Sequence, residues 1–272
     1  MFKVFGQIAA NLSFVFVFLG IIFLMVLIAY LIEWFARKKN GGTERILSTR
    51  KIVVIGMFSA LSTILMLLEF PVPFAPPTIY KLDFSELPAL IGGFAFGPVA
   101  GVLIELVKIL LKTLIKGTST AFVGELANFI IGCSFVLPAS AIYMLKKRKT
   151  TAVISCIAGT LVITVAGSLF NAFYLLPTFA NMFHTDLNAI VEMGKAVNKF
   201  VTDVPRFTLF IVAPVNLLKG VMVSLPTLLI YKPLSPILKG SKTSKKEKAK
   251  AGDKAEMKAE MKAEAKAEES KK

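Results

Sequence analysis

The 272-residue sequence has few of the side chains on which soluble enzymes rely. It holds one histidine, His184, and two cysteines, Cys133 and Cys156, which lie inside apolar runs without C-x-x-C spacing. A histidine-based triad or metal site therefore lacks a second partner, and no disulfide framework is indicated. We interpret both cysteines as small packing residues, and we expect no cofactor and no metal site.

Motifs for nucleotide and peptide chemistry are also absent. The chain contains no G-x-x-x-x-G-K-[ST] loop, no H-E-x-x-H and no G-x-S-x-G. It has no visible means of hydrolysing ATP or a peptide. If the protein transports a substrate uphill, the energy comes from a partner.

Charge is scarce and apolar residues are plentiful. Only 18% of residues are charged while 55% are hydrophobic, and the mean hydropathy is +0.70. The apolar residues form runs too long for a soluble domain to bury, so the lipid bilayer is the expected surroundings. The net charge of +15 comes from Lys and Arg at the ends of apolar runs and in the tail, which favours membrane flanks over nucleic-acid binding.

The first apolar run, residues 8–32, contains no charge. As a helix it would extend about 37 Å, enough to cross a hydrocarbon core of about 30 Å. It is too long for the apolar region of a signal peptide, and a bulky basic segment follows it. Because Arg37, Lys38 and Lys39 outweigh Lys3, we expect the N-terminus to face outward.

Further spans are expected after this helix, and Gly97-Pro98 interrupts one of the runs. Two helices within that run place both basic clusters, Arg50-Lys51 and Lys146–Lys149, on the cytoplasmic side. The loops at 71–86 and 177–203 then face outward and the C-terminus is cytoplasmic. The expected spans are 52–69, 87–115 as two segments, 121–145, 151–176 and 205–231.

Three parts of the chain are distinguished by composition. Residues 1–49 form an extra N-terminal transmembrane helix and linker, 50–239 the membrane domain, and 240–272 a charged tail of Lys, Glu and Ala. The tail has good helix propensity but no apolar face, so we expect it to be solvated.

Polar side chains inside the spans are the candidates for function, because they are costly in lipid and usually face the bundle interior or a cavity. Asn216 and Lys219 share a helical face and offer amide and cationic donors, unless Asn216 satisfies backbone freed by Pro214 and Lys219 snorkels to the headgroups. Asn171 lies among aromatics that suit a planar ligand, or else makes an interhelical hydrogen bond. The full set is Glu105, Lys108, Glu125, Asn128, Asn171, Asn216 and Lys219.

Two other features have structural interpretations. Glu105 and Lys108 are three residues apart, and an ion pair is the favoured interpretation. Gly56 and Ala60, with Ser59 and Ser62 nearby, give the second span a small face that lets another helix approach closely.

Four segments in order carry a family resemblance, which covers residues 50–235. They are FPVPFAPPTIYKLDFSELPALIGGFAFGPVAGVLIELVK at 70–108, GELANFIIG at 124–132, FNAFYLLP at 170–177 and APVNLLKG at 213–220. The chain resembles the substrate-binding (S) subunits of energy-coupling factor (ECF) transporters, in the riboflavin branch. The first helix and the tail fall outside this pattern.

The resemblance implies an all-α integral membrane protein, with a six-helix core plus one extra N-terminal transmembrane helix. It implies binding of riboflavin or FMN as transported ligand, no enzymatic activity, and partnership with a transmembrane coupling subunit and two cytoplasmic ATPases in a bacterial cell membrane. The coupling subunit would meet Gly56 and Ala60. The implied substrate-binding residues, together with those proposed above, are Tyr80, Lys81, Leu82, Asp83, Asn128, Asn171, Tyr174, Asn216 and Lys219.

Three alternatives remain open. The first is an S subunit for a different vitamin or heterocycle. The second is an intramembrane enzyme that uses Glu105 and Glu125, and the third is a membrane scaffold without a ligand.

Overall fold

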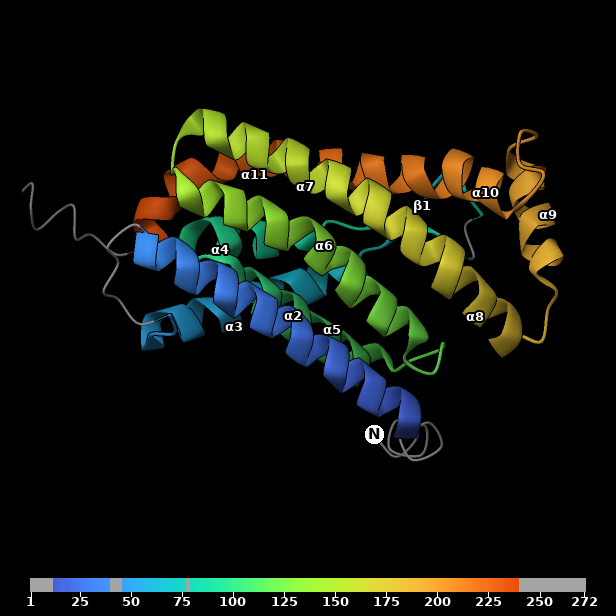
Figure 1. Cartoon of the computed structure of the whole chain (residues 1–272), viewed down its shortest axis with the longest axis horizontal. Coiled ribbons are helices and arrows are strands. Elements are labelled where there is room, and N and C mark those ends of the chain that lie inside the picture. The colour runs from blue at the N-terminus through green and yellow to red at the C-terminus, as the bar shows by residue number, and fades with distance from the viewer. Residues whose placement is uncertain (1–11, 40–45, 77–78, 240–272) are drawn as a thin grey trace, which may run out of the picture. The chain divides into compact units, whose positions relative to one another are not determined.

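The computed structural model describes residues 12–39, 46–76 and 79–239, and they fold almost wholly into helices (Figure 1). The chain divides into two units, each defined by its internal contacts: Met1–Ile230 and Tyr231–Lys272. The tail predicted at 240–272 lies outside the described residues. The helices are α2 (Leu12–Lys39), α3 (Thr49–Leu67), α4 (Glu86–Phe96), α5 (Pro98–Lys116), α6 (Val123–Leu145), α7 (Lys149–Phe170), α8 (Leu176–Met182), α9 (Leu187–Val197), α10 (Val204–Phe207) and α11 (Ala213–Lys239).

Five stretches of the described chain are long and apolar enough to cross a membrane: Phe16–Lys39, Thr49–Leu67, Val123–Leu145, Lys149–Met182 and Val204–Tyr231. They correspond to the spans predicted at 8–32, 52–69, 121–145, 151–176 and 205–231. The all-α membrane fold expected from the sequence is therefore confirmed.

The predicted break at Gly97-Pro98 separates α4 from α5. Gly97 has φ +110°, which a side chain would disfavour, and Pro98 begins α5, where its missing N–H is no loss. With 11 residues, α4 is only about 16 Å long, too short to span alone. It packs against α3, α5 and α6, and nearly all of its residues are buried. These neighbouring helices bury α4, which is too short to cross the membrane by itself.

Two π-helical turns lie within the long helices. η1 (Asn171–Leu175) joins α7 to α8, and η2 (Thr208–Val212) joins α10 to α11. Each π-turn stands just before a proline, Pro177 or Pro214, which cannot donate a backbone hydrogen bond. The helix accommodates each proline by widening its preceding turn, so the chain stays helical through it.

The predicted outer loop at 177–203 is more ordered than its proline and polar residues suggested. Helix continues to Met182 in α8, and the amphipathic piece within the loop forms α9, which buries Ile190, Val191 and Gly194. Loop residues Val72 and Leu82 join Ile190 and Val191 in one core cluster. The two loops predicted to share one membrane face therefore pack together.

Two short strands of two residues each, which were not predicted from the sequence, pair at the base of the proline-rich loop. Strand β1 (Phe70–Pro71) pairs antiparallel with β2 (Lys81–Leu82), with Phe70 opposite Leu82 and Pro71 opposite Lys81. In β2 the side chain of Leu82 is buried while that of Lys81 is exposed, as expected from strand alternation.

The N-terminal helix α2 lies along α5 and α6 (Figure 1). Ala29 and Ala36 are buried in this contact. The carboxylate of Glu33 accepts a hydrogen bond from the Val99 backbone N–H at 3.1 Å, within the first turn of α5, where an anion is favourable. The helix that falls outside the family resemblance is thus packed on the core by specific contacts.

Candidate functional site

A cavity of about 530 Å³ lies where the proline-rich loop meets the helix ends. It is lined from the β2 region, from the α5–α6 connection, from the start of α6, from the η1–α8 segment and from α11. Polar lining residues include Tyr80, Lys81, Asp83, Lys112, Lys116, Thr118, Thr120, Glu125, Asn128, Asn171, Asn216 and Lys219, and the aromatic ones include Phe179 and Phe183.

Seven of the nine residues predicted to bind substrate line this cavity: Tyr80, Lys81, Asp83, Asn128, Asn171, Asn216 and Lys219. The other two lie elsewhere. Leu82 is buried in the core cluster of the loop, because the strand turns it away from Lys81. Tyr174 is stacked on Phe170, with ring centroids 5.1 Å apart.

Asn171 connects the loop to the membrane helices. Its Oδ1 accepts a hydrogen bond from the Tyr80 hydroxyl at 3.0 Å, and its Nδ2 donates to the Gly167 carbonyl at 2.8 Å. The Tyr80 ring packs against Phe207. The loop is thereby held over the cavity at a point where η1 widens the helix.

Asn216 is buried, and its amide nitrogen has no hydrogen-bond partner. The neighbouring residue on α7 is Gly167, where an added Cβ would lie 2.6 Å from the Asn216 Nδ2. Glycine at 167 therefore makes room for this amide. An unpaired buried donor is costly, and here it belongs to a side chain that lines a cavity.

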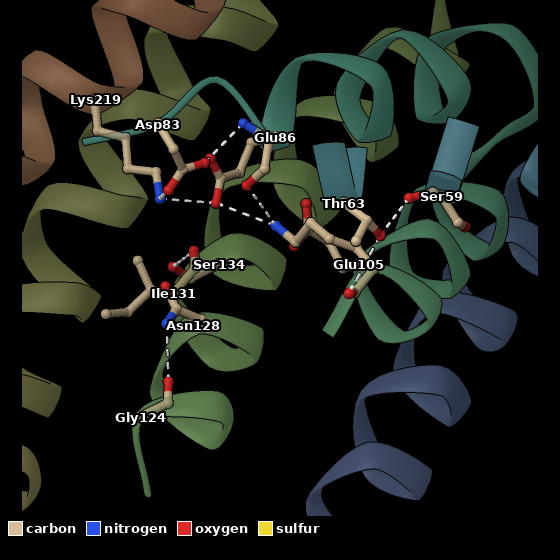
Figure 2. A network of polar contacts seen from close by, with 12 residues as sticks. Ser59, Thr63, Asp83, Glu86, Glu105, Gly124, Asn128, Ile131, Ser134 and Lys219 are labelled. Atoms are coloured by element: carbon tan, nitrogen blue, oxygen red, sulfur yellow. Dashed lines mark hydrogen bonds and ion pairs between the residues drawn. The ribbon is translucent and has the colours of Figure 1, made fainter. Parts of the chain in front are cut away.

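Lys219 is the cation that α11 contributes to the cavity. Its Nζ lies 2.8 Å from Glu86 Oε1 and 3.6 Å from Asp83 Oδ2, and Figure 2 shows these three side chains gathered at one point. Asp83 Oδ1 also accepts a hydrogen bond from the Ser85 backbone N–H at 2.7 Å. The ammonium group is held by carboxylates inside the bundle, so it does not snorkel to the headgroups.

The ion pair expected between Glu105 and Lys108 is present, with 2.6 Å between Nζ and Oε2. Lys108 also contacts Glu86 Oε1 at 3.3 Å and donates to the Ser85 hydroxyl at 3.0 Å. Glu86 therefore lies between two lysines, Lys108 and Lys219. It connects the cavity wall to the fully buried Glu105–Lys108 pair, and Figure 2 shows Glu86 with Lys219 on one side and Glu105 on the other.

Glu125 is a cavity residue that was singled out in the sequence but not assigned to the binding site. Its carboxylate accepts hydrogen bonds from Lys112 at 2.8 Å, Thr118 at 2.9 Å and Thr120 at 3.3 Å. These contacts satisfy the carboxylate within the α5–α6 connection. Asn128, one turn further, donates to the Gly124 carbonyl at 2.9 Å.

The connection between α5 and α6 has an uncommon backbone. Ala121 and Phe122 have φ of 42° and 71°, although neither is glycine. Non-glycine residues with positive φ are uncommon and cluster at functional sites. This backbone conformation was not predicted from the sequence, because Ala and Phe are not typical of such positions.

Glu69 links two segments of the chain at the mouth of the cavity. It accepts hydrogen bonds from Lys81 at 2.8 Å and from Lys116 at 2.9 Å, which joins the loop to the end of α5. Partial burial raises the pKa of the Glu69 carboxyl, but these two lysines outweigh it and leave the pKa below its ordinary value. Burial also raises the pKa of the Tyr80 hydroxyl, which keeps that donor protonated.

The face predicted for partner docking lies away from the cavity. Gly56 and Ala60 are exposed on α3, and nothing lies within 4 Å of a Cβ built on Gly56. Large apolar neighbours on the same helix are exposed as well: Ile52, Val53, Met57, Leu61 and Ile64.

Comparisons with known proteins agree on one group of relatives. A family model described as "ECF transporter, substrate-specific component" matches residues 50–231. The chain is 35% identical over 195 residues to riboflavin transporter RibU of Staphylococcus aureus, with 70% of this chain and 93% of that protein covered. It is 30% identical to riboflavin transporter FmnP of Bacillus subtilis, with 70% and 94% covered.

A solved structure described as the S component of a bacterial ECF transporter also matches. Its TM-score is 0.54 and its sequence identity 35%, and the match covers 70% of this chain and 98% of that one. The family match begins at residue 50, so α2 lies outside it.

Proposed function

This chain belongs to the family of ECF transporter substrate-specific components, and on that premise we propose that it captures riboflavin outside the cell and delivers it inward. Its role is binding and transport, not catalysis. The two carboxylates of the enzyme alternative do not form a pair, because Glu105 is buried beside Lys108 whereas Glu125 is satisfied in the α5–α6 connection.

The observation that carries the proposal is the chemistry of the cavity. Its volume of about 530 Å³ is within the ~300–1,000 Å³ usual for small-molecule sites. The Asn216 amide offers a free donor, Lys219 a held cation, and Phe179 an aromatic surface. A flat heterocycle with carbonyl and ring-nitrogen acceptors matches this set, and relatives that carry the name riboflavin transporter support the choice of flavin.

Roles can be assigned to the cavity residues on this proposal. Asn216 and Lys219 donate to acceptors of the isoalloxazine ring or the ribityl chain, and Asn128 and Asp83 contact polar groups of the ligand. Asn171 and Tyr80 hold the loop closed over it. Lys81 acts at the mouth through Glu69, and Leu82 supports the loop from the core.

FMN is a second candidate ligand, and the charges of the cavity favour it. Four lysines, Lys81, Lys112, Lys116 and Lys219, line the cavity. Lys81 and Lys116 lie at its mouth, where they share the single carboxylate of Glu69. This local excess of positive charge suits a phosphate group near the mouth.

The protein acts with partner subunits of its transporter, which supply the energy. We propose that these are one transmembrane coupling subunit and two cytoplasmic ATPases. The coupling subunit would dock on the small face of α3 at Gly56 and Ala60, where a close helix–helix approach is open.

The protein is a multi-pass membrane protein, and we propose the bacterial cell membrane with the cavity facing outward. Support comes from the basic clusters, which lie on one side of the fold. Lys51 pairs with Glu33 near the end of α2 at 3.6 Å, and the ends of α2 and α6 line one groove. The positive-inside rule assigns that side to the cytoplasm.

Equilibrium binding of riboflavin to the purified full chain tests the proposal, with quenching of flavin fluorescence as the signal. We expect saturable binding of one flavin per chain and a yellow preparation from cells grown with the vitamin. Competition by FMN and by unrelated heterocycles separates the flavin assignment from another vitamin. Absence of saturable flavin binding would reject the assignment and favour a different ligand or a scaffold.

A further inference from the structure

A second hollow, of about 600 Å³, lies between the N-terminal helix α2 and helix α6. It shares no lining residue with the flavin cavity. Ile32, Phe35 and Ala36 line it from α2, Ala141, Ile142 and Leu145 line it from α6, and Lys38 and Lys39 complete it. The groove thus combines apolar walls with a basic end.

The groove depends on the docking of α2, which is held firmly at this end. The Glu33 side chain is fully buried and pairs with Arg37 at 2.5 Å, in addition to its bond to the Val99 N–H. A buried carboxylate that caps α5 keeps α2 in one rotational setting. The residues of α2 that line the groove lie before and after Glu33 in the sequence, and they are therefore presented on a defined face.

The charge around the groove is of one sign. Its lining residues include two lysines and no carboxylate. The next residue after Leu145 is Lys146, which is exposed and begins the basic turn that ends α6. Glu33, the acidic residue of this end of α2, is turned to α5. An anion with a long apolar part is the complementary occupant.

Trp34 indicates the depth at which the groove lies in the bilayer. Tryptophan is enriched at the boundary between hydrocarbon and headgroups, and Trp34 is partly exposed. The Nζ of Lys38 lies 5.2 Å from the centre of its ring, and Phe35 meets the ring edge-on at 4.8 Å. The lysines are therefore at headgroup level, and the apolar walls extend into the acyl-chain region.

From these contacts we propose that the groove between α2 and α6 binds an anionic phospholipid in the leaflet that the Lys146–Lys149 turn faces. Its phosphate pairs with Lys38 and Lys39, and an acyl chain lies along Ile32, Phe35 and Leu145. Basic pockets between transmembrane helices are typical of such sites. The lipid would hold the extra helix against α6, a function independent of flavin binding.

The chain contains one tryptophan, which gives a direct experiment. The full-length protein is reconstituted without flavin in vesicles of mixed lipids that contain brominated phosphatidylglycerol or, separately, brominated phosphatidylcholine. Bromine on the acyl chain quenches nearby tryptophan. We expect the phosphatidylglycerol to quench Trp34 at a lower mole fraction than the phosphatidylcholine.

Variants locate the effect at the groove. Lys39→Gln should reduce the preference for phosphatidylglycerol about fivefold, and it leaves Lys38 on the Trp34 ring. Ala141→Phe should fill the groove and reduce quenching by the anionic lipid while both lysines remain. The matched control is Lys199→Gln, which removes an exposed lysine outside the groove and should retain the parent's preference.

Two results would overturn the proposal. One is equal quenching by the two lipids in the parent protein, which means that ordinary surrounding lipid or another protein covers the groove. The other is a preference that Lys39→Gln and Ala141→Phe leave unchanged, which places the anionic lipid elsewhere.

Discussion

The Nζ of Lys219 lies 2.8 Å from Oε1 of Glu86, so the cation that α11 turns to the cavity is held by a carboxylate at the start of α4. Lys108 contacts the same oxygen from the other side. Lys219 is thereby positioned before any ligand arrives, and little side-chain entropy remains to be lost on binding. Preorganisation of this kind is what a scavenger of a scarce vitamin requires.

Lys219→Met should lower riboflavin affinity about ten- to a hundredfold, because a charge-assisted hydrogen bond in a desolvated site is worth about 1.5 to 3 kcal/mol. The matched control is Lys108→Met, which shares Glu86 but does not line the cavity. That control should lower thermal stability while affecting affinity much less. Fluorescence titration and thermal unfolding of both variants give the comparison, and unchanged affinity in Lys219→Met would remove this residue from the site.

Asn216→Leu should weaken riboflavin binding about tenfold and leave the ligand-free protein as stable as the parent, or more stable. The Asn216 Nδ2 has no partner to lose, and removing an unpaired buried donor relieves its desolvation penalty. Asn171→Leu is the contrasting variant, because the Asn171 amide is hydrogen-bonded to Tyr80 and Gly167. Loss of this amide should lower both riboflavin affinity and the stability of the ligand-free protein. Equal destabilisation of the two variants would contradict the assignment of Asn216 as a ligand donor.

Local chemistry explains which features could be predicted from the sequence. The helix break at Gly97 follows from a Gly-Pro pair, and Asn171, Asn216 and Lys219 stood out because polar groups are rare in apolar spans. The last span was predicted to run through Pro214, but the π-turn η2 that accommodates this proline was not predicted.

The remaining features depend on partners distant in the chain. Glu86 stands at the beginning of an apolar run and gives no local sign that Lys108, 22 residues later, will approach it. The Glu33 carboxylate caps α5 through Val99, 66 residues away. Pairings of this kind depend on how helices pack, which one sequence does not reveal.

Acid should loosen the cavity mouth through Glu69. Its pKa is lowered in the folded chain by Lys81 and Lys116, despite partial burial. The bridge is therefore fully formed at pH above the ordinary value of 4.5 and is lost as the pH falls below it. Riboflavin dissociation should accelerate in that range. Riboflavin should dissociate faster from Glu69→Gln at neutral pH, and its dissociation rate should not rise further in the acidic range. An identical pH profile in parent and variant would exclude Glu69 as the titrating group.

The orientation of the chain can be tested by cysteine labelling. In a background with Cys133 and Cys156 replaced by Ala, a membrane-impermeant maleimide should label Asn188→Cys in intact cells. Arg148→Cys should react only after permeabilisation, because basic turns remain in the cytoplasm. Both positions are exposed, so accessibility within the fold does not limit either reaction. The reverse pattern would invert the topology.

Gly56→Leu and Ala60→Leu should each abolish riboflavin uptake by cells while the purified subunit binds riboflavin as the parent does. A bulky side chain holds a partner helix away from α3, and neither residue lines the cavity. Gly20→Leu on α2 is the matched control, because its Cβ also meets open space but lies outside the family match. It should retain uptake. Loss of uptake in all three variants would indicate that a bulky side chain disturbs membrane insertion in general. Loss of riboflavin binding in the two α3 variants would show that this face supports the cavity instead of a partner.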